Sequence, residues 1–331
     1  RGSELFSRWW GTPATPKSLT MAYGTINNPL KPPRRRLLNI QGICLCIFLP
    51  WLAFVALYTI LTFSVAYQYP GFATACIVVG YLLVVLMFAL AYRARRRDRE
   101  PLWYNFFGWA LLVAVTAATI CGSLNHWHNM RPFYDIENLK TYPNVDPSVS
   151  LGQQTMDAGR VYFAEHTCVE ETKASWFKDN DVYCVAPIVM GRGPAQDRCN
   201  LRAKAGMDPV VPLTGTYDYW AVGVNCCSGV KPEFVKCGHP RQLRARSGLR
   251  MMKDEQRSFF RLAVQQAEVA YGIAANHPLF FYWTEDPVAD MLEYRDEGFR
   301  YYLIGLFGHF AINALGTVFA VVGFWKLGEM W

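Results

Sequence analysis

Four long segments without charged residues constrain this chain more than any other feature of its sequence. They run from Leu37 to Ala66, from Phe72 to Tyr92, from Leu102 to Leu124 and from Tyr301 to Trp325. A helix of about 20 apolar residues, rising about 1.5 Å per residue, crosses the hydrocarbon core of a bilayer. The sequence therefore predicts an α-helical membrane protein with four transmembrane helices. Pro50 is expected to kink the first, because proline removes one helical hydrogen bond.

The basic residues beside these segments predict how the chain is oriented in the membrane. Arginines precede the first segment at positions 34–36 and follow the second between 93 and 99, whereas the turn 67–71 between the two carries no charge. Lys and Arg concentrate on the cytoplasmic side of membrane proteins. Both chain ends are thus expected on the cytoplasmic, stromal or matrix side. The region after Leu124 is expected on the outer or lumenal side of a plasma membrane or endomembrane, with an organelle membrane as the alternative.

The net charge of +7 does not indicate a nucleic-acid-binding surface. Residues 125–300 hold 20 Lys and Arg against 22 Asp and Glu, so the positive excess belongs to the segments beside the apolar runs. A nucleic-acid-binding domain carries its basic residues on its own folded surface. We therefore expect the lipid bilayer and other membrane-protein subunits as partners, and no nucleic acid.

The same boundaries divide the chain into four regions. These are an N-terminal tail (1–36), transmembrane helices one to three (37–124), an outer or lumenal α+β domain (125–300), and transmembrane helix four with a short tail (301–331). Within 125–300 we expect a helix over 151–164, a hairpin over 175–189 with its turn at 178–181, one or two strands over 210–224, a helix over 254–271 and a helix start at Asp286-Pro287.

Ten cysteines separate into two groups. Cys44, Cys46, Cys76 and Cys121 lie in the apolar segments, where we interpret them as small packing residues. The six others lie in the region expected outside the cytoplasm: Cys168, Cys184, Cys199, Cys226, Cys227 and Cys237. An even number on that side predicts three disulfides, and fifteen pairings are open. The adjacent Cys226 and Cys227 are expected to bond to two different partners.

Two other uses of the cysteines are weaker hypotheses. A metal site from Cys226, Cys227, Cys237 and His239 lacks the Cys-x-x-Cys spacing that is typical of zinc ribbons. A cysteine nucleophile at Cys168 has His166 close to it in sequence, but sequence proximity does not establish geometry. No catalytic constellation emerges, so we do not expect an enzyme.

The fourth apolar segment carries the few distinctive residues of the membrane part. His309 and Asn313 lie one helical turn apart, and His309 is a candidate ligand for haem or chlorophyll, although an interhelical hydrogen bond is the commoner role. Small residues would let another helix approach closely, either one of this chain or one of a partner. The positions predicted for such partner-helix packing are Gly308, Gly316 and Ala320.

The topology resembles that of the tetraspanins: four spans, a very short first outer loop, a basic inner loop and a large second outer loop with cysteines. The run Cys226-Cys227-Ser228-Gly229 is similar to the Cys-Cys-Gly signature of that family, with a serine inserted. The segments 215–229 and 259–271 also resemble uncharacterised multi-pass membrane proteins of dinoflagellate-type algae. The first resemblance covers topology and one short motif, and the second leaves a plastid or mitochondrial complex open.

These observations lead to three hypotheses about function. The first is a non-catalytic organiser or structural accessory subunit of a membrane assembly, which docks partners through its outer domain and its fourth helix. The second is an accessory subunit of a pigment- or haem-bearing photosynthetic or respiratory complex. The third is a channel or receptor component. The near absence of ionisable residues inside the spans disfavours a pump or transporter.

Overall fold

The computed structural model describes residues 40–96, 102–191, 212–227, 234, 236–240, 242 and 244–329. The predicted tail 1–36, the arginines at 34–36 and Cys199 lie outside these residues. The chain divides into two compact units. Residues 125–300 form the first, called here the sheet domain, and the described residues up to 124 and from 301 onward form the second, called here the membrane unit.

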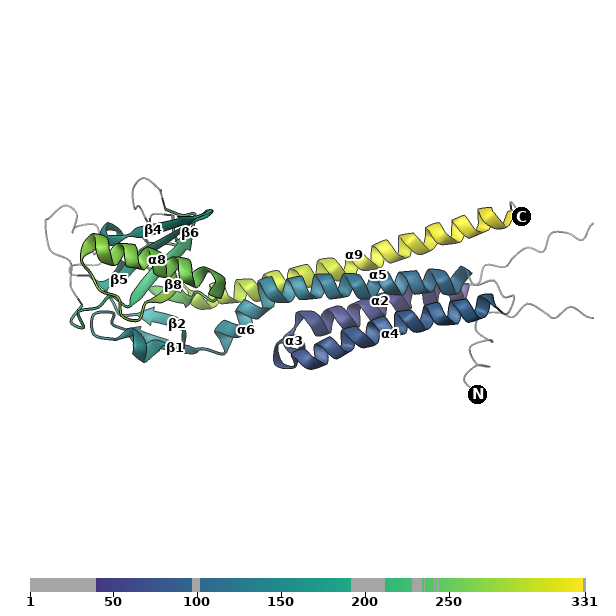
Figure 1. The fold of residues 1–331 in the computed structure, drawn as a ribbon, viewed down its shortest axis with the longest axis horizontal. Coiled ribbons are helices and arrows are strands. Elements are labelled where there is room, and N and C mark those ends of the chain that lie inside the picture. Colours follow the sequence, from purple (N-terminus) through teal and green to yellow (C-terminus); the bar gives the residue numbers. More distant parts are fainter. Residues whose placement is uncertain are drawn as a thin grey trace, which may run out of the picture. The chain divides into compact units, whose positions relative to one another are not determined.

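Four helical segments in the described part of the chain are long and apolar enough to cross a membrane. The protein is therefore a multi-pass membrane protein, as the sequence predicts. The helices that contribute to the membrane unit are α2 (Ile40–Thr62), α3 (Ser64–Gln68), α4 (Pro70–Arg95), α5 (Leu102–Asn125) and the second half of α9 (Pro287–Glu329). They are drawn in Figure 1.

The structure corrects two details of the predicted spans. The turn expected at residues 67–71 is mostly helical, because α3 continues to Gln68 and α4 already begins at Pro70. Proline suits that position, since the first turn of a helix does not need its N–H. The helix expected to start at Asp286-Pro287 and the fourth span are one helix of 43 residues, α9.

The sheet domain is built around one mixed sheet of eight strands. Its order is β1-β2-β7-β8-β6-β5-β3, and β4 also pairs with β5. The pairs β1–β2 and β6–β8 are parallel and the others antiparallel. The strands are β1 (Lys140–Val145), β2 (Ala158–Phe163), β3 (Thr167–Val169), β4 (Ser175–Asp179), β5 (Asp181–Met190), β6 (Tyr219–Val224), β7 (Ser247–Arg250) and β8 (Leu279–Thr284). Short helical pieces complete the domain: η1 (His126–Met130), α6 (Arg131–Glu137), η2 (Gly152–Thr155) and η3 (Glu171–Lys173).

The two faces of the sheet are covered in different ways. On one face lies α8 (Asp254–Tyr271), whose buried stripe consists of Phe260, Ala263, Val264 and Ala267. Figure 1 shows α8 lying across the strands, and it packs on β4 and β5. The opposite face buries a separate cluster that includes Phe163, Phe281, Trp283 and the half-cystines Cys184 and Cys237. This second face has disulfides where the first has an amphipathic helix.

The sequence predicted some of these elements and missed others. The helix over 254–271 is confirmed, as is the hairpin, although its turn is only Asn180, which adopts a φ of 58°. The strand expected within 210–224 is β6, which begins at Tyr219. The helix expected over 151–164 is wrong. That segment contains η2 and then β2, because Val161 and Phe163 alternate with half-exposed residues and pair with β1 and β7.

The start of α9 follows the predicted capping pattern. The Asp286 carboxylate oxygen Oδ1 accepts hydrogen bonds from the backbone N–H groups of Val288, at 2.9 Å, and Ala289, at 3.3 Å. Pro287 occupies the first position of the helix, where its missing N–H costs nothing. Asp286 of the sheet domain thus caps the helix that continues as the fourth membrane span.

Candidate functional site

The membrane-spanning half of α9, which begins at Tyr301, contacts α2 through polar side chains. The Asn313 nitrogen Nδ2 donates a hydrogen bond to the Ile47 carbonyl oxygen at 2.7 Å and lies 3.4 Å from the Cys46 carbonyl oxygen. Pro50 stands four residues after Cys46 and has no N–H, so the helix cannot satisfy that carbonyl itself. Because lipid offers no hydrogen bonds, Asn313 supplies the donor that Pro50 lacks.

Indole, hydroxyl and aromatic groups continue the contact between α2 and α9. Trp51 Nε1 donates to the Leu306 carbonyl at 3.2 Å, and the Tyr58 hydroxyl donates to the Tyr301 carbonyl at 3.0 Å. The ring pairs across this contact are Phe48–Phe310, Trp51–Phe310, Phe54–His309, Tyr58–Tyr302 and Phe63–Tyr302. One side of α9 is therefore occupied by α2.

His309 lies within this contact and is buried. Its imidazole stacks on the Phe54 ring with 4.1 Å between centroids and 1° between planes. Only 9% of the residue is exposed, and Nδ1 has no hydrogen-bond partner among the described residues. One face of the ring is thus covered by Phe54. The ligation of haem or chlorophyll by His309 stays a prediction.

The glycines of α9 fall into two classes. A Cβ atom on Gly305 would lie 2.7 Å from Tyr58 Cε1, so that glycine is needed where α9 meets α2. A Cβ atom on Gly308, Gly316 or Gly323 would meet nothing within 4 Å. Within the described chain, Gly308 and Gly316 therefore have no helix against them, although small residues were predicted to pack there. Ala320, the third predicted position, is half-buried. We call Gly308, Gly316, Ala320 and Gly323 the open face of α9.

Glycines in the other spans do contact neighbouring helices. A Cβ atom on Gly122 of α5 would lie 2.7 Å from Leu61 Cβ, and one on Gly80 of α4 would lie 3.2 Å from a methyl group of Val115. These glycines allow close approach between helices of the same unit. Gly308, Gly316 and Gly323 of α9 thus differ from Gly80 and Gly122, which contact neighbouring helices.

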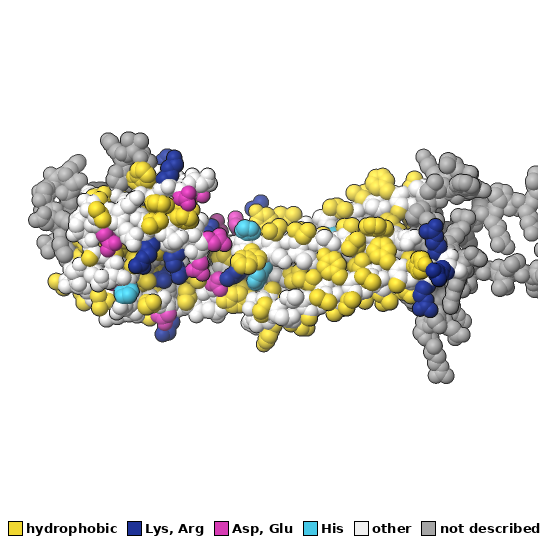
Figure 2. Space-filling view, in the orientation of Figure 1, with side chains coloured by type: hydrophobic (Ala, Val, Ile, Leu, Met, Phe, Trp, Pro, Cys, Tyr) yellow, Lys and Arg dark blue, Asp and Glu magenta, His cyan; other side chains and the backbone are white. Residues whose placement is uncertain are grey.

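The membrane half of α9 is also the most exposed of the four spans. Only 6% of its most apolar window is buried inside the structure, against 39% for the window that contains α5. Its large apolar side chains Phe307, Ile312 and Phe319 are 65%, 68% and 72% exposed. Figure 2 shows hydrophobic side chains over much of the visible surface of the spans. Lipid or another membrane helix must cover this surface.

Basic residues stand at one end of the membrane unit. Arg93 and Arg95 lie in the last turn of α4, and Arg96 follows directly. Between Ile40 and Gly323, the other described residues of this unit carry no Lys, Arg, Asp or Glu. The charge asymmetry on which the predicted orientation rests is thus present at the C-terminal end of α4.

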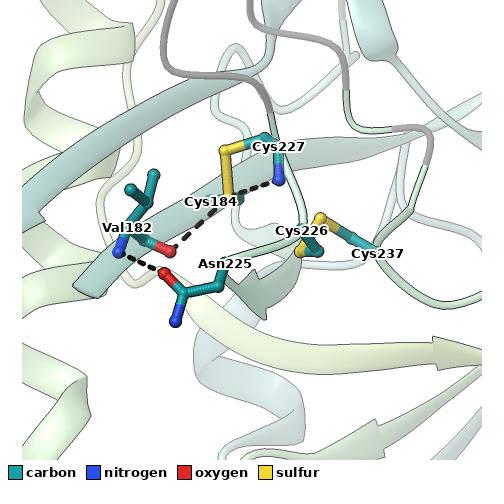
Figure 3. Close-up of a disulfide and its surroundings, with 6 residues drawn as sticks. All are labelled: Val182, Cys184, Asn225, Cys226, Cys227 and Cys237. Carbon is teal, nitrogen blue, oxygen red and sulfur yellow. Dashed lines mark hydrogen bonds between the residues drawn. A yellow bond between two sulfur atoms is a disulfide. The ribbon is translucent and has the colours of Figure 1, made fainter.

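The sheet domain contains the second group of distinctive residues, the paired cysteines drawn in Figure 3. Cys184 of β5 is bonded to Cys227, and Cys226 is bonded to Cys237. The prediction that the adjacent Cys226 and Cys227 have different partners is confirmed. Cys168 is also disulfide-bonded, while Cys199 lies outside the described residues.

A glycine provides the space for these two bridges. Gly223 of β6 stands directly opposite Cys184 in the β5–β6 ladder. A Cβ atom there would lie 2.3 Å from Cys226 Sγ and 3.1 Å from Cys237 Cβ. The sulfur atoms of Cys184, Cys226 and Cys237 all lie within 4.8 Å of one another. In this oxidised form they are bonded in disulfides, and His239, the fourth residue of the hypothetical metal site, is exposed.

The four remaining cysteines are free thiols in the membrane unit. Cys46 is buried and Cys76 is half-buried, as small packing residues would be. Cys44 and Cys121, in contrast, are exposed. The packing interpretation thus fails for these two within the described chain, because no described element covers them.

A buried pair of asparagines, which was not predicted from the sequence, lies where the chain leaves α5. Asn125 Nδ2 donates to the Gly298 carbonyl of α9 at 2.8 Å, and Asn129 Nδ2 donates to Asn125 Oδ1 at 2.8 Å. A Cβ atom on Gly298 would lie 2.6 Å from Met130 Sδ. The spacing of four residues between the asparagines, just after the apolar run, was the available signal. These contacts attach the first half of α9 to the segment after α5.

In one cluster of the sheet domain, the side chains shift one another's pKa values. Lys140 Nζ lies 2.9 Å from Asp157 Oδ2, and the Tyr142 hydroxyl donates to Asp157 Oδ1 at 2.7 Å. The hydrogen bonds from Lys140 and then Tyr142 lower the pKa of Asp157 below its ordinary value, while the same Asp157 raises the pKa of Lys140. The cluster is partly exposed, and it joins β1 to the residue that precedes β2.

No protein-family model, curated protein or solved structure matches this chain.

Proposed function

We propose that this protein is a non-catalytic membrane organiser or accessory subunit of a larger membrane assembly. In this proposal the open face of α9 packs against a transmembrane helix of another subunit. Its partners are lipid and other membrane proteins. The observation that carries the proposal is the empty space beside Gly308, Gly316 and Gly323, in a helix whose Gly305 is tightly packed.

The chemistry of helix association in lipid supports this role for the open face. Lipid tails are as apolar as leucine, so helices associate in membranes through close backbone approach and van der Waals packing at small residues. Gly316, Ala320 and Gly323 lie close to one line along the helix, because they are spaced by three, four and seven residues. The same line carries His309 and Asn313, so these three residues continue the α2-facing side of α9 beyond Asn313, whereas Gly308 lies on a different side. Glycine is a poor helix former, by about 1 kcal/mol relative to alanine, which favours a packing role for glycines retained there.

The polar contacts of α9 support the same proposal. Asn313 donates a hydrogen bond to α2, and the carbonyl groups of Leu306 and Tyr301 accept hydrogen bonds from α2. α9 is therefore fixed on one side, while its exposed apolar residues lie elsewhere around the helix. A helix held in this way can present a defined surface to a partner without losing its place in its own unit.

The proposed orientation puts both chain ends on the cytoplasmic, stromal or matrix side and the sheet domain on the outer or lumenal side. Arg93, Arg95 and Arg96 at the end of α4 favour it, since basic residues concentrate on the inner side. The disulfides of the sheet domain favour it as well, because disulfides persist in oxidising compartments. The sheet domain would then dock partners on that side.

Purification of the intact particle in mild detergent tests the proposal. The protein would be isolated from its native membrane, and subunit stoichiometry would be determined by mass spectrometry together with an absorption spectrum. We expect other membrane proteins in fixed stoichiometry. A particle that contains only this chain and lipid would contradict the accessory-subunit role. Pigment or haem bands would support the second hypothesis, and ion flux in liposomes the third.

A further inference from the structure

The two disulfides of the sheet domain are not independent of each other. Cys184 belongs to one bridge, and Cys226 and Cys237 form the other, yet these three sulfur atoms lie within 4.8 Å of one another. Thiol–disulfide exchange requires a thiolate to reach a disulfide sulfur. Opening either bridge therefore places a thiolate beside the sulfur atoms of the other.

We propose that Cys184, Cys226, Cys227 and Cys237 form a disulfide-exchange relay. The relay accepts two electrons from a dithiol and keeps them as a vicinal thiol pair, Cys226 and Cys227, while a new bridge joins Cys184 to Cys237. The vicinal pair can then reduce a disulfide on an acceptor. This inference does not depend on the proposed role of α9 in assembly.

Burial favours this product over simple opening of one bridge. Cys184 and Cys237 are 0% and 2% exposed, whereas Cys226 and Cys227 are half-buried. A thiolate pays a desolvation penalty when it is buried, so the negative charge is better held near solvent. Simple opening of either bridge leaves one buried thiol and one half-buried thiol. The exchanged form has its bridge between the two buried sulfurs and both thiols at the half-exposed positions.

The surroundings of Cys184 suit a sulfur that passes through the reduced state. The Cys227 backbone N–H donates a hydrogen bond to Cys184 Sγ at 3.1 Å, an interaction that stabilises a thiolate. The Val182 carbonyl oxygen lies 3.7 Å from the same sulfur and would accept a hydrogen bond from the thiol. Both contacts are drawn in Figure 3. The hydrogen bond from the Cys227 N–H offsets part of the desolvation cost of the Cys184 thiolate when Cys227 is attacked, and the thiolate is consumed in the next exchange step.

The steps balance with a dithiol as the reductant. One thiolate of the dithiol attacks Cys227 Sγ, forms a mixed disulfide and releases the Cys184 thiolate. That thiolate attacks Cys237 Sγ, forms the Cys184–Cys237 bond and releases the Cys226 thiolate, which takes up a proton. The second thiol of the dithiol then loses its proton and attacks the dithiol sulfur that is bonded to Cys227. This closes the dithiol into a disulfide and releases Cys227 as a thiolate, which takes up a proton. The dithiol is oxidised to a disulfide, and one of the two protein bridges is reduced to two thiols.

Peptide mapping after limited reduction of the full-length protein in detergent tests this relay. Free thiols would first be blocked with N-ethylmaleimide. The protein would then be titrated with dithiothreitol and labelled with iodoacetamide. Linked and labelled peptides of the four cysteines would be identified by mass spectrometry, so the state of Cys168 does not affect the readout.

In the species that has accepted two electrons in this cluster, we expect labels on Cys226 and Cys227 and a peptide linked through Cys184 and Cys237. Labels on Cys226 with Cys237, or on Cys184 with Cys227, would mean simple opening of one bridge and would overturn the proposal. Simultaneous labelling of all four, with no two-electron species, would overturn it too.

A variant tests the same preference without a reductant. In Cys227→Ser, three cysteines of the cluster remain and only one bridge can form. The relay predicts a Cys184–Cys237 bridge and a free thiol at Cys226, which would take one label in the non-reduced protein. A free thiol at Cys184 would contradict the proposed preference. If this variant does not fold, the titration of the unaltered protein still decides.

Discussion

The sheet domain and the membrane unit differ in how completely their own residues cover their surfaces. In the sheet domain, α8 covers one face of the sheet and a disulfide-bonded cluster covers the other. In the membrane unit, α9 contacts α2 through residues as far as Asn313, and it is largely exposed beyond them and on its other sides. The difference indicates that the sheet domain covers its own apolar faces, whereas the membrane unit has an apolar surface that lipid or another membrane helix must cover.

The largest expected effect is the loss of the α8 face. Phe260 is 0% exposed, and its ring lies 5.3 Å from that of Tyr183 and 5.8 Å from that of Phe280. We expect Phe260→Ala to lower the free energy of unfolding by about 3 to 5 kcal/mol, because it leaves a cavity under the helix. The measurement is denaturant unfolding of the full-length protein in micelles, followed by tryptophan fluorescence.

A matched control on the same helix is Val269→Ala, at a residue that is 88% exposed. Its cost should stay within about 0.5 kcal/mol, since surface substitutions rarely exceed that. Equal costs for the two variants would mean that α8 does not cover the sheet as described.

On the disulfide-bonded face of the sheet, adding a single methyl group at Gly223 is expected to destabilise the fold. A methyl group at Gly223 would lie 2.3 Å from Cys226 Sγ, so Gly223→Ala must displace a bridge or a strand. We expect a loss of about 1 to 3 kcal/mol, the usual cost of overpacking. Gly215→Ala is not a suitable control, because Gly215 has a φ of 74°. Ala221→Gly in the same strand removes a methyl group instead, and it should leave both bridges intact by peptide mapping.

In the membrane unit, the contact between α9 and α2 can be weakened at a single side chain. Asn313→Leu removes the donor to the Ile47 and Cys46 carbonyls, and we expect a loss of about 1 kcal/mol, typical of hydrogen bonds in membranes. Thr119→Val is the control, because the Thr119 hydroxyl donates only within its own helix, to Val115. Unfolding in mixed micelles measures both.

A double-mutant cycle with Pro50→Ala sharpens this test. Alanine restores an N–H that can bond to the Cys46 carbonyl within α2. Asn313→Leu should then cost less than it does beside proline, which the cycle reports as a coupling energy. Additive costs would contradict the view that Asn313 replaces the donor that Pro50 lacks.

The smallest expected effect is the pH dependence at Asp157. Its pKa is lowered in the folded protein by Lys140 and Tyr142. A lowered folded pKa stabilises the protein above the unfolded value of about 3.9, and the contribution is lost as pH falls through the folded pKa. The stability advantage of the unaltered protein over Asp157→Asn should therefore be present at pH 6 and shrink on acidification below about pH 4. A constant difference across this range would contradict it.

How far the sequence predicts this fold depends on whether the signal is local. Uncharged runs, the stripe of α8 and the Asp286-Pro287 cap are local patterns, and each gave the right element. β2 was mistaken for a helix, because its pairing with β1 and β7 is set by distant residues. β7 and β8 were missed for the same reason: Leu249 pairs with Tyr282, 33 positions later.

The candidate sites show the same limit. The small residues of α9 and the different partners of Cys226 and Cys227 could be predicted from the sequence. The need for glycine at position 223, where a side chain would collide with the disulfide sulfur atoms, could not be predicted, because it depends on the register between β5 and β6. Nor could the pairing of Asn313 with the Pro50 region, because Asn313 and Cys46 are 267 positions apart in the sequence.

The measurement that tests the central claim most directly compares three variants of α9 in the native membrane. The double variant Gly308→Leu/Gly316→Leu fills the open face of α9. Ala311→Leu adds the same side chain at another exposed position, and Gly305→Leu introduces a steric clash with Tyr58 of α2. We predict that the first loses its co-purifying subunits while its unfolding free energy is unchanged, that the second keeps them, and that the third is destabilised. Retention of all subunits by Gly308→Leu/Gly316→Leu would contradict the proposed role of the open face of α9.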